Sequence, residues 1–279
     1  MKHFERIKQE EGLNMIQENP CALLDFGKLI LAKGGTYEGT SGEREILMVL
    51  LAGICSVRVG DKSFSPVGGR PSVFAGKPHA VYIPPKSRFV VKAEGEGSAE
   101  AALAFARAEE PREPFHIAPS EVVTGRWGVS NFSRAFHQIL VHGVPAGKAP
   151  QRLIVGETFT PSGNWSTYPP HRHEHDAPPQ EAFMEEMYYF KVSPPDGWGL
   201  LKFYTDDRTI DELHTVEDET IAKMPRGYHT VVSAPGYTTY YLWFLAGNTR
   251  VQATVADPRV GWVERAIPMI KNIEDNLAC

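Results

Sequence analysis

MPRGYHTVV, residues 224–232, lies over IPPKSRFVV, residues 83–91, at an offset of 141 residues in a chain of 279. Both segments place an apolar residue before a proline and end in a pair of valines. Self-similarity at a fixed spacing is typical of a duplicated architecture. We therefore expect two related halves, in which His229 of the second half is matched by Arg88 of the first.

The segments around this repeat have the composition of β-strands. The 25 glycines and 22 prolines cut the chain into short runs rich in β-branched and aromatic residues, which is the pattern of an all-β fold. The expected strands are residues 56–60, 80–84, 88–93, 152–161, 187–193, 239–247 and 250–257. Helical spacing is limited to residues 1–10 and 130–140, and the charged, proline-rich segment 108–121 is expected to link the halves.

Composition excludes several classes of function. The 29 basic and 34 acidic residues form no long like-charge runs, so neither nucleic acid nor a membrane is an expected partner. The cysteines, Cys21, Cys55 and Cys279, are too few and too widely spaced for a disulfide framework or a cysteine-based zinc site. The apolar run 46–55 is about half the length of a membrane span, and the N-terminal segment is too charged for a signal peptide. We expect a cytoplasmic protein.

The histidine-rich stretch PPHRHEHDAPPQ, residues 169–180, predicts a metal site. Residues at i and i+2 of a strand share a face, so His171 and His173 can converge on one ion. The prolines that follow end the strand, which leaves His175 in a loop. No His-x-His precedes residue 171, so we expect metal only in the second half.

Two later segments supply further ligands. In EEMYYFKVS, residues 185–193, the alternation that puts Lys191 outside points Glu186 and Tyr188 inward, although Glu185 or Glu181 is an alternative ligand. The turn in PRGYH, residues 225–229, delivers His229 at the start of a strand. Three imidazoles and a carboxylate suit one divalent ion with open positions: zinc, with manganese, iron or nickel as alternatives. Against this, a lone His-x-His is often only a solvated surface pair.

Several long motifs resemble the bicupin uronate isomerases of the cupin superfamily. They are EILMVLLAGICSVRVGD, VFAGKPHAVYIPP, PPHRHEHD, EEMYYFKVSPPDGWGLLKFYTDD, VEDETIAKMPRGYH and YYLWFLAG, in order along the chain. The resemblance implies a duplicated cupin, or bicupin, with two jelly-roll β-barrels and few short helices. It places a barrel without metal ligands at residues 1–115 and a metal-binding barrel at 116–279. The family's ligands fall on His171, His173, Glu186 and His229.

The resemblance also implies a metal-dependent aldose–ketose isomerase acting on a deoxy-uronate. The implied reaction converts 5-deoxy-glucuronate to 2-deoxy-5-keto-gluconate in myo-inositol catabolism. Such a reaction needs a base, for which Glu186, Tyr188 and a hydroxide held by the metal are candidates. Arg208 and Arg226 are candidate partners for the substrate carboxylate.

Two other classes of function remain as alternatives. One is an iron-dependent cupin dioxygenase, and the other is a non-catalytic sugar-acid-binding bicupin. The sequence contains no helix-turn-helix pattern or basic patch, which counts against a regulator. The expected partner is a small-molecule sugar acid, and the sequence is compatible with a homo-oligomer.

Overall fold

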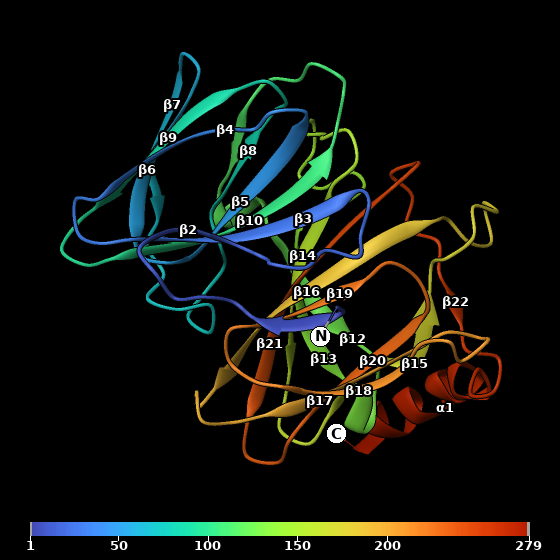
Figure 1. The fold of residues 1–279 in the computed structure, drawn as a ribbon. Helices are drawn as coiled ribbons and strands as arrows, with labels where there is room; N and C mark the ends of the chain where they lie inside the picture. Colours follow the sequence, from blue (N-terminus) through green and yellow to red (C-terminus); the bar gives the residue numbers. More distant parts are fainter. Residues whose placement is uncertain (1, 278–279) are drawn as a thin grey trace.

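The computed structural model describes residues 2–277, and strands dominate it (Figure 1). In the first half, a six-stranded sheet, here the large N-sheet, faces a four-stranded one, the small N-sheet. The large N-sheet has the order β11 (Phe115–Ile117), β8 (Ala80–Ile83), β5 (Arg44–Ala52), β10 (Ala99–Arg107), β3 (Leu24–Leu31) and β2 (Gly12–Met15). The small N-sheet has the order β4 (Thr36–Thr40), β9 (Arg88–Glu94), β6 (Ile54–Val59) and β7 (Lys62–Gly68).

The second half repeats this plan with a seven-stranded large C-sheet and a five-stranded small C-sheet. The large C-sheet has the order β1 (Phe4–Arg6), β19 (Thr220–Met224), β16 (Met184–Ser193), β21 (Thr238–Gly247), β14 (Ile154–Thr160), β13 (Arg134–Leu140) and β12 (Val123–Trp127). The small C-sheet has the order β18 (Asp211–Val216), β17 (Gly199–Tyr204), β20 (Tyr228–Ser233), β15 (Trp165–Arg172) and β22 (Val255–Ala256). Helical structure consists of the 3₁₀ turns η1 (Pro119–Glu121) and η2 (Ser130–Phe132) and the helix α1 (Trp262–Leu277).

The large sheets pack against each other, because their central strands are apolar on both faces. On β5, Ile46, Met48 and Leu50 face the small N-sheet. The alternate residues Leu47, Val49 and Leu51 join a core shared with the second half. This period-2 division puts one hydrophobic core inside each half and a third between the halves.

The repeated sequence segments occupy matching places in the two halves. IPPKSRFVV runs from the end of β8 into β9, and MPRGYHTVV runs from the end of β19 into β20. Arg88 pairs in register with Thr40 of β4, whereas His229 pairs with His171 of β15. The duplication therefore predicted correctly that Arg88 stands where the second half has His229.

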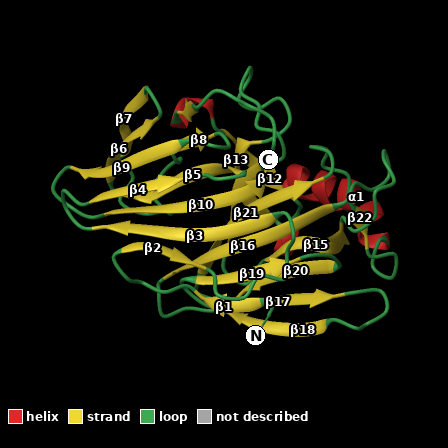
Figure 2. Cartoon of the chain, turned by 45° about the horizontal axis from the view of Figure 1, so that its top comes forward, coloured by secondary structure: helices red, strands yellow, loops and turns green. Residues whose placement is uncertain are grey.

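One edge strand of each large sheet comes from the other half of the chain. The strand β1 pairs with β19 of the large C-sheet (Figure 2), and β11 pairs with β8 of the large N-sheet. Because β11 spans residues 115–117, it crosses the expected boundary between residues 115 and 116. The halves are thus interlocked by their first strands.

Two buried glutamates, Glu185 and Glu45, hydrogen-bond the backbone of the opposite half, and we call each set of bonds a clasp. Glu185 of β16 accepts hydrogen bonds from the backbone of the first half, from Ala22 at 2.7 Å, Leu23 at 2.7 Å and Leu24 at 3.1 Å. Glu45 of β5 does the same for the second half, accepting 2.7 Å bonds from Gln151, Arg152 and Leu153. Each carboxylate therefore satisfies the backbone just before the opposing strand, β3 or β14.

The two segments expected to be helical are strands. Phe4–Arg6 pairs with β19, so sheet hydrogen bonds override the helical propensity of residues 1–10. Within residues 130–140, η2 is followed by β13, whose register shifts between Gln138 and Leu140. This bulge buries the neighbouring residues Ile139 and Leu140 together, which imitates helical spacing in the sequence.

The C-terminal region also differs from expectation. Of residues 250–257 only β22 is a strand, and the helix α1 was not expected from the sequence. Its signal is the spacing of Val263, Ile267 and Ile270, which pack with Phe132 and Val129 in a small core of their own. The helix lies beside β15 and β22 (Figures 1 and 2).

We expect Glu45→Gln and Glu185→Gln each to lower the free energy of unfolding by about 1–3 kcal/mol, because a neutral amide is a poorer acceptor for buried N–H groups. Urea denaturation followed by tryptophan fluorescence measures the change. The control is Glu96→Gln, whose side chain is 94% exposed and which we expect to alter stability by less than about 0.5 kcal/mol. Two variants as stable as this control would contradict the clasp.

Candidate active site

The structure brings the four predicted metal ligands together inside the second half. One donor atom from each of His171, His173, Glu186 and His229 lies within 4.8 Å of the other three. Among residues 2–277 no other histidine, cysteine or carboxylate group forms such a cluster. We call these four residues the ligand cluster.

Strands position three of the four members, and His173 lies one residue beyond the end of β15. His171 on β15 and His229 on β20 are direct cross-strand partners, with ring centroids 4.7 Å apart. Gly227, with φ of +94°, makes the turn before β20; a side chain there would approach the Tyr204 carbonyl to 2.7 Å. On β16, Glu186 shares the inward face with Tyr188, whereas Glu185 faces the first half.

Hydrogen bonding within the cluster fits a cation. His173 donates from Nδ1 to the Met184 carbonyl at 2.6 Å, which leaves Nε2 as an acceptor. That nitrogen lies 2.9 Å from Oε2 of Glu186, and Nε2 of His229 lies 3.0 Å from the same oxygen. His229 is fully buried, and neither of its ring nitrogens has a hydrogen-bond partner. Lone pairs that converge in this way are satisfied by a positive charge placed between them.

The protonation states agree with ligation. Burial, together with the neighbouring His229, holds the pKa of His171 well below its usual value, so its imidazole is neutral at pH 7. Burial alone would raise the pKa of Glu186, but the His229 and His173 imidazoles outweigh it and lower that pKa. His171 thus offers a neutral nitrogen and Glu186 an ionised carboxylate, the forms that bind a divalent ion. Burial lowers the pKa of His173, but the hydrogen bond to the Glu186 carboxylate outweighs it and raises that pKa.

The ligand cluster opens into a cavity of about 390 Å³ between the sheets of the second half and α1. Aromatic rings dominate its wall, namely those of Trp127, Tyr168, Tyr188, Tyr241 and Trp243. Glu264 and Ile267 of α1 contribute the helical side of the lining. A concave site with an apolar wall and a few polar groups is the usual form of a small-molecule site.

Tyr188 lies against the ligand cluster, with its ring 5.3 Å from that of His229. Burial, followed by the charge of Glu186, raises the pKa of Tyr188 well above its usual value. The phenol is therefore protonated at neutral pH. In this state it can donate a proton or hydrogen bond, whereas it is a poor base.

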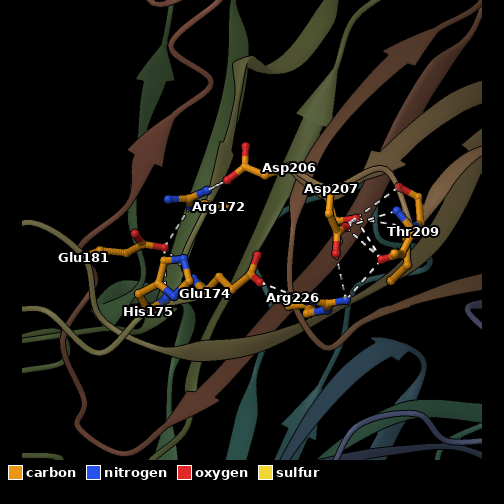
Figure 3. Close-up of polar contacts among 10 residues, drawn as sticks. Arg172, Glu174, His175, Glu181, Asp206, Asp207, Thr209 and Arg226 are labelled. Carbon is orange, nitrogen blue, oxygen red and sulfur yellow. Dashed lines mark hydrogen bonds and ion pairs between the residues drawn. The ribbon is translucent and has the colours of Figure 1, made fainter.

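The other predicted site residues lie elsewhere. Arg226 is exposed and contacts Glu174 at 3.3 Å and Thr209 at 3.2 Å (Figure 3). Arg208 is bonded to Asp211 at 3.2 Å. Neither arginine lines the cavity. His175 is exposed in the loop after β15, as its prolines predicted.

Sequence patterns did not single out the residues that shape the cavity around the cluster. Arg134 and Trp127 stand on β13 and β12, and Trp243 lies on β21. The helical interpretation of residues 130–140 hid Arg134, and the other two carry no motif of their own. The signal available was the density of aromatic residues in TYYLWFLAG, residues 239–247.

The family model described as KduI/IolB matches residues 2–263. The chain belongs to this family. A protein named 5-deoxy-glucuronate isomerase from Geobacillus kaustophilus is 36% identical over 259 residues, covering 91% of each chain. The protein of the same name from Bacillus subtilis strain 168 is also 36% identical and covers 90% of this chain and 93% of its own.

Solved structures support the same assignment. An IolB-like protein from Salmonella typhimurium LT2 superposes with a TM-score of 0.87 at 30% identity, over 95% of this chain and 100% of its own. The oxalate decarboxylase of Lactobacillus farciminis, at 11% identity, superposes with a TM-score of 0.67 over 100% of this chain and 94% of its own. The second likeness concerns the fold alone. It agrees with the mostly β, cupin-like fold expected from the sequence.

The described residues contain no helix long and apolar enough to cross a membrane.

We expect His229→Ala and Glu186→Gln to weaken divalent-metal binding by more than about 100-fold, because each variant removes a direct ligand. Loss of a group that only hydrogen-bonds a ligand costs roughly 10–100-fold. Elemental analysis after dialysis against zinc measures the bound metal. His175→Ala and Glu185→Gln are matched controls that should retain it. Equal metal loss in Glu185→Gln and Glu186→Gln would contradict the inward orientation of Glu186.

Proposed function

We propose that the protein is a metal-dependent isomerase that converts 5-deoxy-glucuronate to 2-deoxy-5-keto-gluconate in myo-inositol catabolism. Family membership, with 36% identity over nine-tenths of two proteins named for this activity, is the observation that carries the proposal. The ligand cluster at the base of an aromatic cavity supports it. An aldose–ketose isomerase needs both a Lewis acid and groups that move a proton between adjacent carbons.

We further propose that His171, His173, Glu186 and His229 hold one divalent ion, zinc in the first instance. Three nitrogens and one oxygen suit zinc, manganese, iron or nickel. When bound, the ion supplies a Lewis acid that stabilises negative charge on the substrate oxygens. The buried His229 imidazole, whose Nε2 faces Oε2 of Glu186 at 3.0 Å, supports this assignment.

The proposal extends to the wider organisation of the protein. We take residues 1–115 and 116–279 as two jelly-roll barrels of a bicupin, of which only the second has a ligand cluster among its described residues. Cytoplasmic location follows from a small-molecule substrate of central metabolism, and a homo-oligomer is compatible with this arrangement.

Glu186 and Tyr188 are the proposed catalytic residues. Both imidazoles face Oε2 of Glu186, which leaves Oε1 of this ionised carboxylate to accept the proton from the hydroxyl-bearing carbon. Tyr188, kept protonated by burial and by Glu186, hydrogen-bonds the oxygen on which negative charge develops. Aromatic rings around them exclude water from the reacting carbons.

Isomerase activity is tested with purified protein and 5-deoxy-glucuronate under anaerobic conditions, with the keto product followed by proton NMR. We expect turnover without oxygen, its loss on chelation, and its recovery with a divalent ion. In D₂O the product should carry deuterium at the former aldehyde carbon, because the proton passes through an exchangeable acid–base group.

The controls separate this function from its alternatives. A dioxygenase would need oxygen and consume it, and a binding protein would release the sugar acid unchanged. Metal-loaded, folded protein that leaves 5-deoxy-glucuronate unchanged would refute the isomerase proposal. An unlabelled product would overturn only the proton-transfer role of Glu186.

A further inference from the structure

The guanidinium of Arg134 lies on the cavity wall without an ionic partner. Arg134 is the first residue of β13, directly after η2, and it lines the same cavity as the ligand cluster. Arg134 is half-buried, and its Nε is buried without a hydrogen-bond partner among the described residues. It is the only arginine or lysine of the cavity lining.

The buried Arg70 shows what a guanidinium taken out of water ordinarily requires. Arg70, between the halves, donates to Glu157 at 2.6 and 3.2 Å. Burial opposes its charge, but the Glu157 carboxylate more than compensates and raises the pKa of Arg70. For Arg134, burial lowers the pKa, and the only opposing groups are the phenols of Tyr241 and Tyr188. Arg134 thus lacks the carboxylate that Arg70 has.

The surroundings hold the Arg134 guanidinium in one orientation. Its central carbon lies 5.5 Å from the centre of the Trp127 ring, at cation–π distance. Gly128 has φ of +78°, and a side chain there would lie 3.1 Å from Nη1 of Arg134 and 2.2 Å from the Phe132 carbonyl. The backbone therefore approaches the guanidinium closely, and glycine is required at this position.

A neighbouring donor is also unsatisfied. Nε1 of Trp243 is buried without a hydrogen-bond partner, and its ring lines the cavity 6.4 Å from that of Trp127. The carboxylates of the lining do not serve these donors. Glu186 faces His173 and His229, and Glu264 on α1 is exposed and forms no ion pair with Arg134.

We propose that Arg134 binds the carboxylate of the sugar-acid substrate and selects acids over neutral sugars. The proposal rests on the isomerase function above, because it presumes a uronate. An arginine fork matches a carboxylate through two parallel hydrogen bonds. The substrate then lies with its acid end at Arg134 and its carbonyl end at the ligand cluster, and Arg208 and Arg226 remain outside the site.

The decisive experiment compares two substrates in three arginine variants. Wild type, Arg134→Gln and Arg134→Lys are assayed with 5-deoxy-glucuronate and with the neutral aldose that carries a hydroxymethyl group in place of the carboxylate. Arg126→Gln is the matched control, because Arg126 is exposed on the adjacent strand and does not line the cavity. Bound metal and thermal unfolding are measured for every variant.

We expect Arg134→Gln to lower kcat/KM for the uronate by about 100-fold or more, mainly through KM, and for the neutral aldose by less than about 3-fold. Arg134→Lys, which keeps the charge but loses the fork, should fall between the two. Metal content should not change. If Arg134→Gln fails to fold, Arg134→Lys alone tests the proposal. It should then lower kcat/KM for the uronate and not for the neutral aldose. Equal losses on both substrates, or an unaffected uronate, would overturn the proposal.

A binding measurement separates this inference from the isomerase proposal. Calorimetric titration of metal-loaded protein with D-glucuronate and with D-glucose requires no turnover. We expect wild type to prefer the acid and Arg134→Gln to lose that preference. A wild-type protein that binds the acid no better than the neutral sugar refutes the role of Arg134, whereas acid binding without isomerisation refutes only the isomerase.

Discussion

The structure depends on the clasp that Glu185 forms with the backbone of the first half. Strand β16 lies at the centre of the large C-sheet, between β19 and β21, and its residues alternate between the two sides of that sheet. Glu185 is bound to three amides across the interface, so its neighbour Glu186 must point the other way, into the cavity. A slip of one residue would exchange the two glutamates, leaving buried amides unsatisfied on one side and the ligand cluster incomplete on the other.

The same arrangement explains why a duplicated chain has one site. Glu45 repeats the clasp from the first half, and β1 and β11 exchange edges between the large sheets. The interface is thus nearly symmetric, and symmetry there maintains the packing of both halves. Inside each half, no contact with the other half requires the two sequences to stay alike. Thr40 and Arg88 occupy the cross-strand positions that His171 and His229 occupy in the second half, so the first half kept the scaffold and lacks the ligands.

The features that could be predicted from the sequence are those that depend on residues close together in the chain, such as strand alternation and tight turns. The alternation on β16 placed Glu186 and Tyr188 inward, and the glycine turn at Gly227 placed His229. Six of the seven expected strands exist in nearly full length, and the seventh retains only β22. Two kinds of feature were out of reach. The bulge in β13 gave a strand the spacing of a helix, and the contact of Glu185 with the first half was not predicted, because its backbone partners lie 161 to 163 residues away along the chain. Long-range pairing leaves no local periodicity to detect.

Unsatisfied polar groups gather at the cavity and its ligand cluster, and they indicate what the site binds. Six described residues have buried side-chain atoms without a hydrogen-bond partner; Arg134, His229 and Trp243 belong to the cavity or its ligand cluster, whereas Arg152, Thr160 and Arg250 lie outside it. Each such group costs about 1–3 kcal/mol of stability. A fold tolerates this cost where a ligand satisfies the groups later, and the chemistry of these groups indicates that ligand. A cation suits Nε2 of His229 and the Glu186 oxygen beside it, and an oxygen-rich anion suits the N–H groups of Arg134 and Trp243. A sugar acid bound beside a divalent ion supplies both.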